Sequence, residues 1–193
     1  MLLGPRLCSA QWLPQPSGTS LTLLGVRFVD SQNGYAVGQS GLVLKTSDGG
    51  DSWVDVSIAT PYPATSVYLA DPSTVWVATG DPNDSEVSGA VWHTTDGGSH
   101  WTQQTLTSTR ARFGLAFANP SVGWACGAHN GTLEFQATTN GGSTWFTQGS
   151  SSLFGWTYGI DCTSTSQVWS VGVVFPSPRW GEGGHSALFS CLH

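Results

Sequence analysis

One short turn motif, T-x-[DN]-x-G-x-x-W, recurs three times along the chain and limits its fold more than any other feature of the sequence. The copies begin at Thr46, Thr94 and Thr138. Three short apolar segments precede each copy, separated by Gly, Asn, Asp or Ser, and no stretch shows an extended helical period. Each repeat therefore offers four strands in about 44 residues, which is the length of one propeller blade. We expect an all-β propeller.

A fourth copy of the repeat is split between the two ends of the sequence. Trp156–Ile160, Trp169–Gly172 and Ala187–Cys191 match the first three strands of the other copies, and the sequence stops where the turn motif would begin. Ser9–Trp12 offers the missing strand, from the same chain or from a neighbouring copy. We therefore expect four four-stranded blades in a single domain over 1–193, with blades at about 21–56, 65–104, 112–148 and 156–193 plus 7–14.

The residues of the turn motif have structural roles in this interpretation. The Asp or Asn accepts backbone N–H groups across a tight turn, and the paired glycines supply positive φ. The Thr ties the strand end to the loop, and the Trp buries a large area against its blade. An acid that holds a turn is a poor candidate for catalysis. We assign this structural role to Thr46, Asp48, Gly50, Trp53, Thr94, Asp96, Gly98, Trp101, Thr138, Asn140, Gly142 and Trp145.

The composition excludes several classes of function. Six Lys and Arg stand against twelve Asp and Glu, for a net charge of −6, whereas nucleic-acid binding needs a basic surface. No apolar run reaches the roughly 18 residues of a membrane span. The five His lack the spacing of metal ligands, so we predict no metal and no cofactor. Few charges with much Ser, Thr and Trp suit a secreted, extracellular or lumenal protein.

The repeat also resembles a known family. Its pattern consists of an aromatic strand, then a Gly followed by an apolar strand, then the turn motif. The aromatic strands are Tyr35-Ala-Val-Gly38, Trp76-Val-Ala-Thr79 and Trp124-Ala-Cys-Gly127. The pattern is similar to that of propellers related to the photosystem II assembly/stability factor. These share the BNR or Asp-box turn with sialidases. The resemblance implies a binding scaffold that docks on a protein partner. In sialidase-type enzymes the box lies far from the active site, so the resemblance implies that the box marks only the fold.

Two kinds of residue are candidates for partner binding. Arg27, Arg110 and Arg112 lie in or just before first strands, which line the channel of a propeller, and could form a small basic rim. Trp180 and Glu182 lie in an insertion that breaks the repeat, and such insertions map to loops on a binding face. Our first hypothesis is a non-catalytic scaffold that binds a protein or glycan partner through loops on one propeller face.

Two alternatives remain open. A structural subunit would assemble into dimers or filaments when Cys8–Trp12 completes the fourth blade of a neighbour. A glycosidase or sialidase-like hydrolase would need paired carboxylates, but Glu86, Glu134 and Glu182 fall in different blades with no evident pairing. We therefore predict that the protein is not an enzyme.

The cysteines and two sequons bear on the compartment of the protein. Cys8 and Cys191 fall in the same turn of the aligned repeat, so we predict a disulfide between them and an oxidising compartment. Cys126 and Cys162 lie in neighbouring blades, and the sequence leaves open a second disulfide or two buried thiols. Asn83 and Asn130 begin N-x-[ST] sequons in expected loops, which predicts glycosylation if the chain is secreted.

Overall fold

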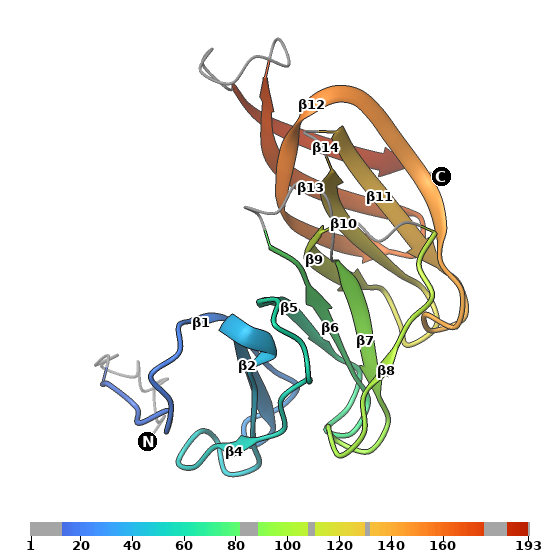
Figure 1. The fold of residues 1–193 in the computed structure, drawn as a ribbon. Coiled ribbons are helices and arrows are strands. Elements are labelled where there is room, and N and C mark those ends of the chain that lie inside the picture. Colours follow the sequence, from blue (N-terminus) through green and yellow to red (C-terminus); the bar gives the residue numbers. More distant parts are fainter. Residues whose placement is uncertain (1–12, 82–88, 108–110, 130–131, 176–184, 193) are drawn as a thin grey trace, which may run out of the picture.

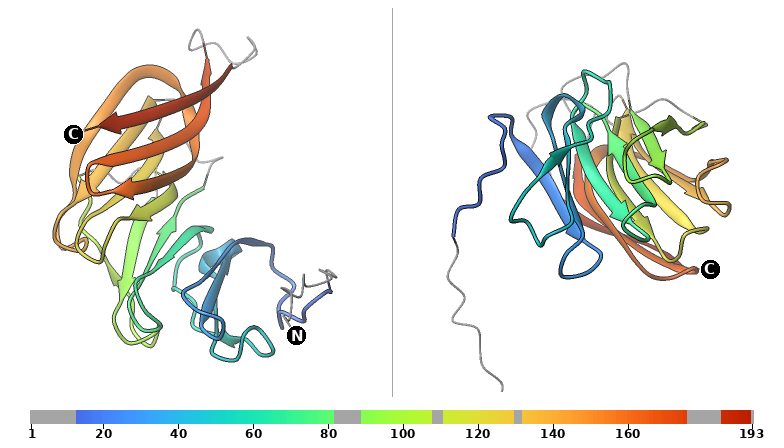
Figure 2. Two further views of the ribbon diagram at one scale, coloured as in Figure 1. Left: turned by 180° about the vertical axis from the view of Figure 1, so that it is seen from behind. Right: turned by 90° about the horizontal axis from the view of Figure 1, so that it is seen from below.

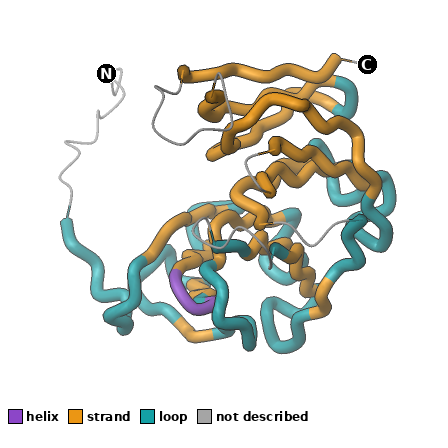
Figure 3. The backbone as a smooth tube through the Cα atoms, turned by 45° about the horizontal axis from the view of Figure 1, so that its top comes forward, coloured by secondary structure: helices purple, strands orange, loops and turns teal. Residues whose placement is uncertain are grey.

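The computed structural model describes residues 13–81, 89–107, 111–129, 132–175 and 185–192. They form an all-β propeller of four blades, whose sheets follow one another along an arc (Figure 1). Within the described ranges, helix is confined to the single 3₁₀ turn η1 (Gln39–Gly41), and the tube in Figure 3 is otherwise strand and loop. The short apolar segments of the repeat therefore form strands, as the sequence predicts.

Blades 1 and 2 are separate antiparallel sheets of four strands, paired in the order of the sequence. Blade 1 consists of β1 (Leu23–Phe28), β2 (Gly34–Gly38), β3 (Val43–Thr46) and β4 (Val54–Asp55). Blade 2 consists of β5 (Ala64–Leu69), β6 (Val75–Thr79), β7 (Ala90–Thr94) and β8 (Thr102–Gln103). The first strand of each blade lies on the inner side of the arc, where β1 packs against β5 and β5 packs against β9.

Blades 3 and 4 share a strand and form one six-stranded sheet, which the sequence did not predict. The sheet contains β9 (Ala111–Phe117), β10 (Gly123–His129), β11 (Thr132–Thr138), β12 (Phe146–Ser164), β13 (Gln167–Phe175) and β14 (His185–Leu192). The start of β12 pairs with β11 and its later part pairs with β13. Pro61 and Pro63 interrupt the link between blades 1 and 2, whereas β12 contains no proline and can continue without a break.

Blade 4 contributes three strands to the described part of the chain: the later half of β12, then β13 and β14. The segment Ser9–Trp12, which we expect to complete this blade, lies outside the described residues. Blades 1 and 4 stand at opposite ends of the arc (Figure 1), and the views from behind and below in Figure 2 show the same order of blades. No pair of strands from these two blades packs closely among the described residues.

The hydrophobic core lies between successive blades. Tyr35, Val37 and Val43 of blade 1 pack against Val67 and Leu69 of blade 2. The next interface joins blades 2 and 3 in the same way, through Trp76, Ala78, Val91, Leu115, Phe117, Ala125 and Trp145. Each inner blade thus uses both of its faces. We call the face that packs on the preceding blade the leading face, and the face that packs on the following blade the trailing face.

Candidate functional site

The Asp-box turns are held by the same hydrogen bonds in all three complete copies. In the first, Thr46 Oγ1 donates to Asp48 Oδ1 over 2.7 Å and accepts the Gly50 N–H over 2.9 Å. The second and third boxes repeat both bonds, at 2.8 and 3.0 Å for Thr94 and at 3.0 and 2.8 Å for Thr138. The glycines of each box have positive φ, for example 98° at Gly50. These side chains are engaged in holding turns.

The aspartates that hold turns have lowered pKa values. Hydrogen bonds from Ser52, first from its hydroxyl and then from its backbone N–H, keep the pKa of Asp48 well below its usual range. His100 lowers the pKa of Asp96 in the same way, first through its backbone N–H. Backbone N–H groups also lower the pKa of Asp30 and Asp71, which close the turns after the first strands. The general acid of a glycosidase needs a raised pKa, so these four carboxyls are unsuited to that role.

A cationic site lies where the inner strands of the blades meet. The guanidinium carbon of Arg27 on β1 lies 5.0 Å from the ring centroid of Tyr68 on β5. That ring stacks in turn on Phe117 of β9, with centroids 4.9 Å apart and an angle of 22°. The sequence places Arg27, Tyr68 and Phe117 on the first strands of three successive blades. The exposed guanidinium of Arg27 therefore lies over the first of two stacked aromatic rings.

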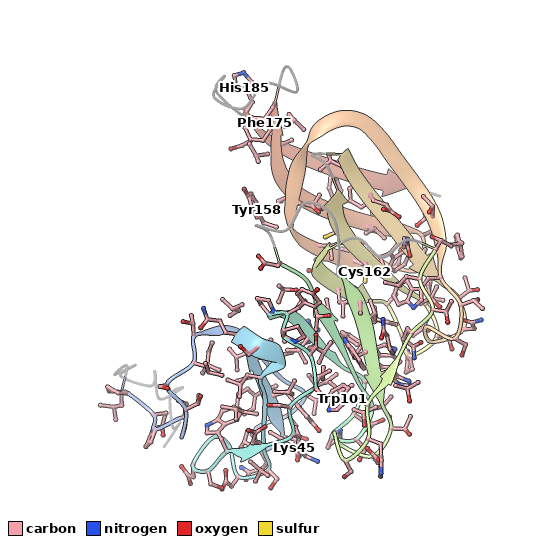
Figure 4. All side chains as sticks on the ribbon, viewed as in Figure 1. Lys45, Trp101, Tyr158, Cys162, Phe175 and His185 are labelled. Atoms are coloured by element: carbon pink, nitrogen blue, oxygen red, sulfur yellow. The ribbon has the colours of Figure 1, made fainter. Side chains whose placement is uncertain are left out.

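Electrostatics extend this site to blade 4. Burial raises the pKa of the Cys162 thiol on β12, Asp161 raises it further, and Arg27 opposes that rise. Burial also raises the pKa of Tyr68, and Arg27 again opposes it. Figure 4 places Cys162 near the middle of the molecule rather than at an outer edge. The field of Arg27 thus reaches groups on blades 2 and 4.

Arg27 keeps its charge available for an external anion. The side chain is exposed, and the sole ion pair among the described residues joins His100 to Asp96 on the outer part of blade 2. A guanidinium binds a carboxylate through two parallel hydrogen bonds, and the ring of Tyr68 restricts its orientation. The site can therefore bind an acidic group that approaches the inner strands.

The other predicted contact residues are not brought to this site by the described structure. Arg112 lies on β9, but its side chain is outside the description. Arg110, Trp180 and Glu182 lie outside the described residues, as do Cys8 and both sequon asparagines, Asn83 and Asn130. Cys191 lies on β14, paired with Val168, without a described side chain. The sequence did not predict Tyr68 as a site residue. The same repeat position is Arg27, Ala116 and Asp161 in the other blades, so it shows no common residue type.

The disulfide between Cys126 and Cys162 that the sequence left open is not formed, and both residues are thiols. Cys126 pairs with Gly114 in the sheet. A Cβ added to Gly114 would lie 2.9 Å from Cys126 Sγ and 2.9 Å from Ile160 Cγ2. Ile160 is therefore the β12 residue beside Cys126. Cys162 lies two residues further along the strand, and packs instead with Trp124 and Val168.

Two further properties of the described residues bear on function. No group of three or more His, Cys, Asp or Glu side chains in these ranges is placed to hold a metal ion. None of the helical structure described is long and apolar enough to cross a membrane.

Comparisons with known proteins agree with the repeat and the fold. A family model described as photosynthesis system II assembly factor YCF48 matches residues 5–111. The photosystem II assembly lipoprotein Ycf48 of Synechococcus sp. (strain RCC307) is 35% identical over 57 residues, which are 30% of this chain and 17% of that protein. The match to this relative thus spans only a small part of its length.

Solved structures share the propeller fold at low sequence identity. A structure of YCF48 bound to a D1 peptide aligns with a TM-score of 0.63 and 19% identity, over 96% of this chain and 61% of that one. An ancestral GH74 enzyme aligns with a TM-score of 0.67 and 15% identity, over 87% of this chain and 24% of the enzyme. This chain spans less than two thirds of either protein, and the likeness establishes the fold alone.

Proposed function

Because this chain belongs to the Ycf48 family of photosystem II assembly factors, we propose that it is a non-catalytic scaffold that binds an acidic segment of a protein partner through Arg27. One observation carries the proposal: Arg27 is exposed on the inner strands and held 5.0 Å from the Tyr68 ring, with no acid paired to it among the described residues. The structural relative that binds a D1 peptide supports a protein partner.

A binding role fits the chemistry of the site better than hydrolysis does. The GH74 enzyme shares the fold, but the turn-holding acids here have lowered pKa values. The buried Glu134 accepts a 2.7 Å hydrogen bond from the Gln136 amide. These carboxyls accept hydrogen bonds within turns or, at Glu134, inside a blade. A glycosidase instead needs a protonated acid beside a second carboxylate.

The proposal includes an extracellular or lumenal location. The Synechococcus relative is named a lipoprotein, which supports a chain that works outside the cytoplasm. Fractionation of cells that produce the protein, followed by protease treatment of the intact compartment, tests this part. Recovery of the chain in the cytosolic fraction would contradict the location without affecting the binding role.

A peptide-binding assay tests the role of Arg27. The probe is a fluorescent D1 peptide, and its polarisation is measured against increasing protein. A charge-assisted hydrogen bond contributes about 1.5–3 kcal/mol, so Arg27→Ala should weaken binding about 10-fold or more, with Arg27→Lys in between. Raised salt should weaken binding to the wild type more than to Arg27→Ala.

Lys45→Ala is the matched control. Lys45 also lies over a tyrosine ring, 5.8 Å from the centroid of Tyr35. Its position in blade 1, away from Cys162, is marked in Figure 4. This variant removes the same charge and should bind the peptide as the wild type does. Equal binding by Arg27→Ala and the wild type, or equal weakening by the two variants, would refute a specific role for Arg27.

A further inference from the structure

Blades 1 and 4, the two end blades of the described structure, each have one apolar sheet face that no other described blade covers. On blade 1 this is the leading face, where Val26 is 65% exposed and Phe28 is also exposed. On blade 4 it is the trailing face, where Trp169 is 36% exposed, Val171 is 49% exposed, and Leu188 is exposed as well. Apolar side chains in such number on a sheet face indicate a contact surface.

Each of these residues has a buried counterpart in an inner blade. Val26 occupies the repeat position of Val67, which is 6% exposed because it packs on blade 1. Val171 pairs with Leu188 across β13 and β14, as Ala78 pairs with Val91 across β6 and β7. Ala78 and Val91 are fully buried against blade 3. The two exposed faces therefore correspond to the two sides of the contact that joins successive inner blades.

The leading face of blade 1 has the same aromatic arrangement as the covered leading face of blade 3. Phe28 and Trp53 meet edge to face, with centroids 6.2 Å apart at 81°. In blade 3, Phe117 and Trp145 meet at 6.1 Å and 88°. There, Phe117 packs on Trp76 of the preceding blade, with centroids 4.6 Å apart. The residue that corresponds to Trp76 on blade 4 is the exposed Trp169.

The leading face of blade 1 is also hollowed. An open hollow of about 420 Å³ lies over β1, between Gln15 and Trp53. Its floor is formed by apolar residues of β1, β2 and β3, including Val26, Ala36 and Leu44. In the inner blades, the preceding blade fills the corresponding space with side chains such as Trp76. The hollow thus has the place and the lining to receive a large aromatic side chain.

We propose that a second copy of this chain covers both faces. The trailing face of blade 4 in each copy packs on the leading face of blade 1 in the other. Trp169 of the second copy then lies against Phe28, as Trp76 lies against Phe117. Within the described part of one chain, blades 1 and 4 stand at opposite ends of the arc and do not make this contact with each other. Two copies bury all four faces in a closed assembly.

Paired charge variants test this arrangement. The wild-type chain should be a dimer in light scattering coupled to size exclusion. Val26→Lys and Val171→Glu should each be monomeric, because each homodimer would bury a charge at both interfaces. An equimolar mixture of the two variants should return to dimer. In that heterodimer one interface is unaltered, and the other faces the new Lys with the new Glu.

Val26 and Val171 are exposed, so both variants should keep the circular dichroism of the wild type. Val54→Lys changes a valine that is 62% exposed on the outer strand of blade 1, and should leave the dimer intact. A monomeric wild type, a larger assembly, or variants that do not recover on mixing would overturn the proposal. Loss of the dimer on deletion of residues 1–12, with Val26→Lys still dimeric, would replace it with strand donation.

Discussion

Tyr35 donates a 2.9 Å hydrogen bond from its hydroxyl to the carbonyl oxygen of Pro72, and so joins blade 1 to the turn between β5 and β6 of blade 2. Blade 2 is joined to blade 3 by a similar bond to a different turn, because Trp76 Nε1 donates over 3.0 Å to the carbonyl oxygen of Gly141 in the Asp-box turn. Both residues occupy the same repeat position and are buried. These two buried aromatic residues therefore also form polar links between successive blades.

Removal of the Tyr35 hydroxyl should destabilise the contact between blades 1 and 2. Tyr35→Phe keeps the ring in the core but leaves the Pro72 carbonyl without this donor. We expect the free energy of unfolding to fall by about 1 kcal/mol, the usual contribution of such a hydrogen bond. Urea denaturation followed by tryptophan fluorescence measures the change. An unaltered midpoint would show that water replaces the lost donor at no cost.

The same residue predicts a loss of stability at alkaline pH. Burial, followed by the charges of Asp71 and Asp96, raises the pKa of Tyr35 to about 12. The unfolded tyrosine ionises near pH 10, so its contribution is complete below about pH 10 and is lost as the pH rises toward 12. Thermal melts at pH 9 to 12 should fall more steeply for the wild type than for Tyr35→Phe. Parallel curves would contradict the prediction.

The Asp boxes predict the opposite dependence at acid pH. The pKa values of Asp48 and Asp96 are lowered in the folded chain, so their contribution is present above the unfolded pKa of about 3.9 and is lost as the pH falls below it. The third box supplies the control, because Asn140 accepts the same Thr hydrogen bond without a charge. The double variant Asp48→Asn/Asp96→Asn should lose less stability between pH 5 and pH 2 than the wild type. Melting curves over this range decide the matter.

Close approach of blades 3 and 4 makes Gly114 sensitive to substitution. A Cβ there would lie 2.9 Å from side-chain atoms of both Cys126 and Ile160, whereas a Cβ at Gly159 would meet Val171 at 3.4 Å. Overpacking of a core costs about 1–3 kcal/mol. Gly114→Ala should therefore unfold at clearly lower urea than Gly159→Ala. Equal midpoints would mean that β9 and β12 separate easily.

The thiols and the predicted clasp can be measured together. Burial and Asp161 raise the pKa of Cys162, so less of its thiol is ionised at neutral pH. Cys126 is fully buried. Both should react slowly with iodoacetamide in the folded chain and quickly in urea. Mass mapping without reductant would then show a Cys8–Cys191 disulfide, which stays a prediction. Alkylation of Cys8 and Cys191 without prior reduction would contradict it.

The sequence predicted the blades well because their signals are local. The Thr, Asp or Asn, and Gly of each box lie within a few residues of one another, and their bonds form inside one turn. The union of blades 3 and 4 was missed, because Gly149 and Gly155 resemble breaks in the sequence. In the structure they are held in β12 by pairing with β11 and β13.

The candidate site was predicted only in part, since its geometry is not local. The position of Arg27 on a first strand placed it on the inner side of the arc. Its contact with Tyr68 joins residues of two blades, far apart in sequence, and no motif records it. Likewise, the repeat identifies Val26 and Val171 as interior positions. Only the order of blades in space shows that no other described blade covers either residue.

The shared strand β12 divides the molecule mechanically. A pull or a local opening at the edge of blade 4 is passed along β12 directly into the hydrogen bonds of blade 3, so these two blades open and close cooperatively. Blades 1 and 2 have no strand in common, and Pro61 and Pro63 lie in the link between their sheets. Amide exchange should therefore be correlated across β11, β12 and β13, while blade 1 exchanges on its own timescale.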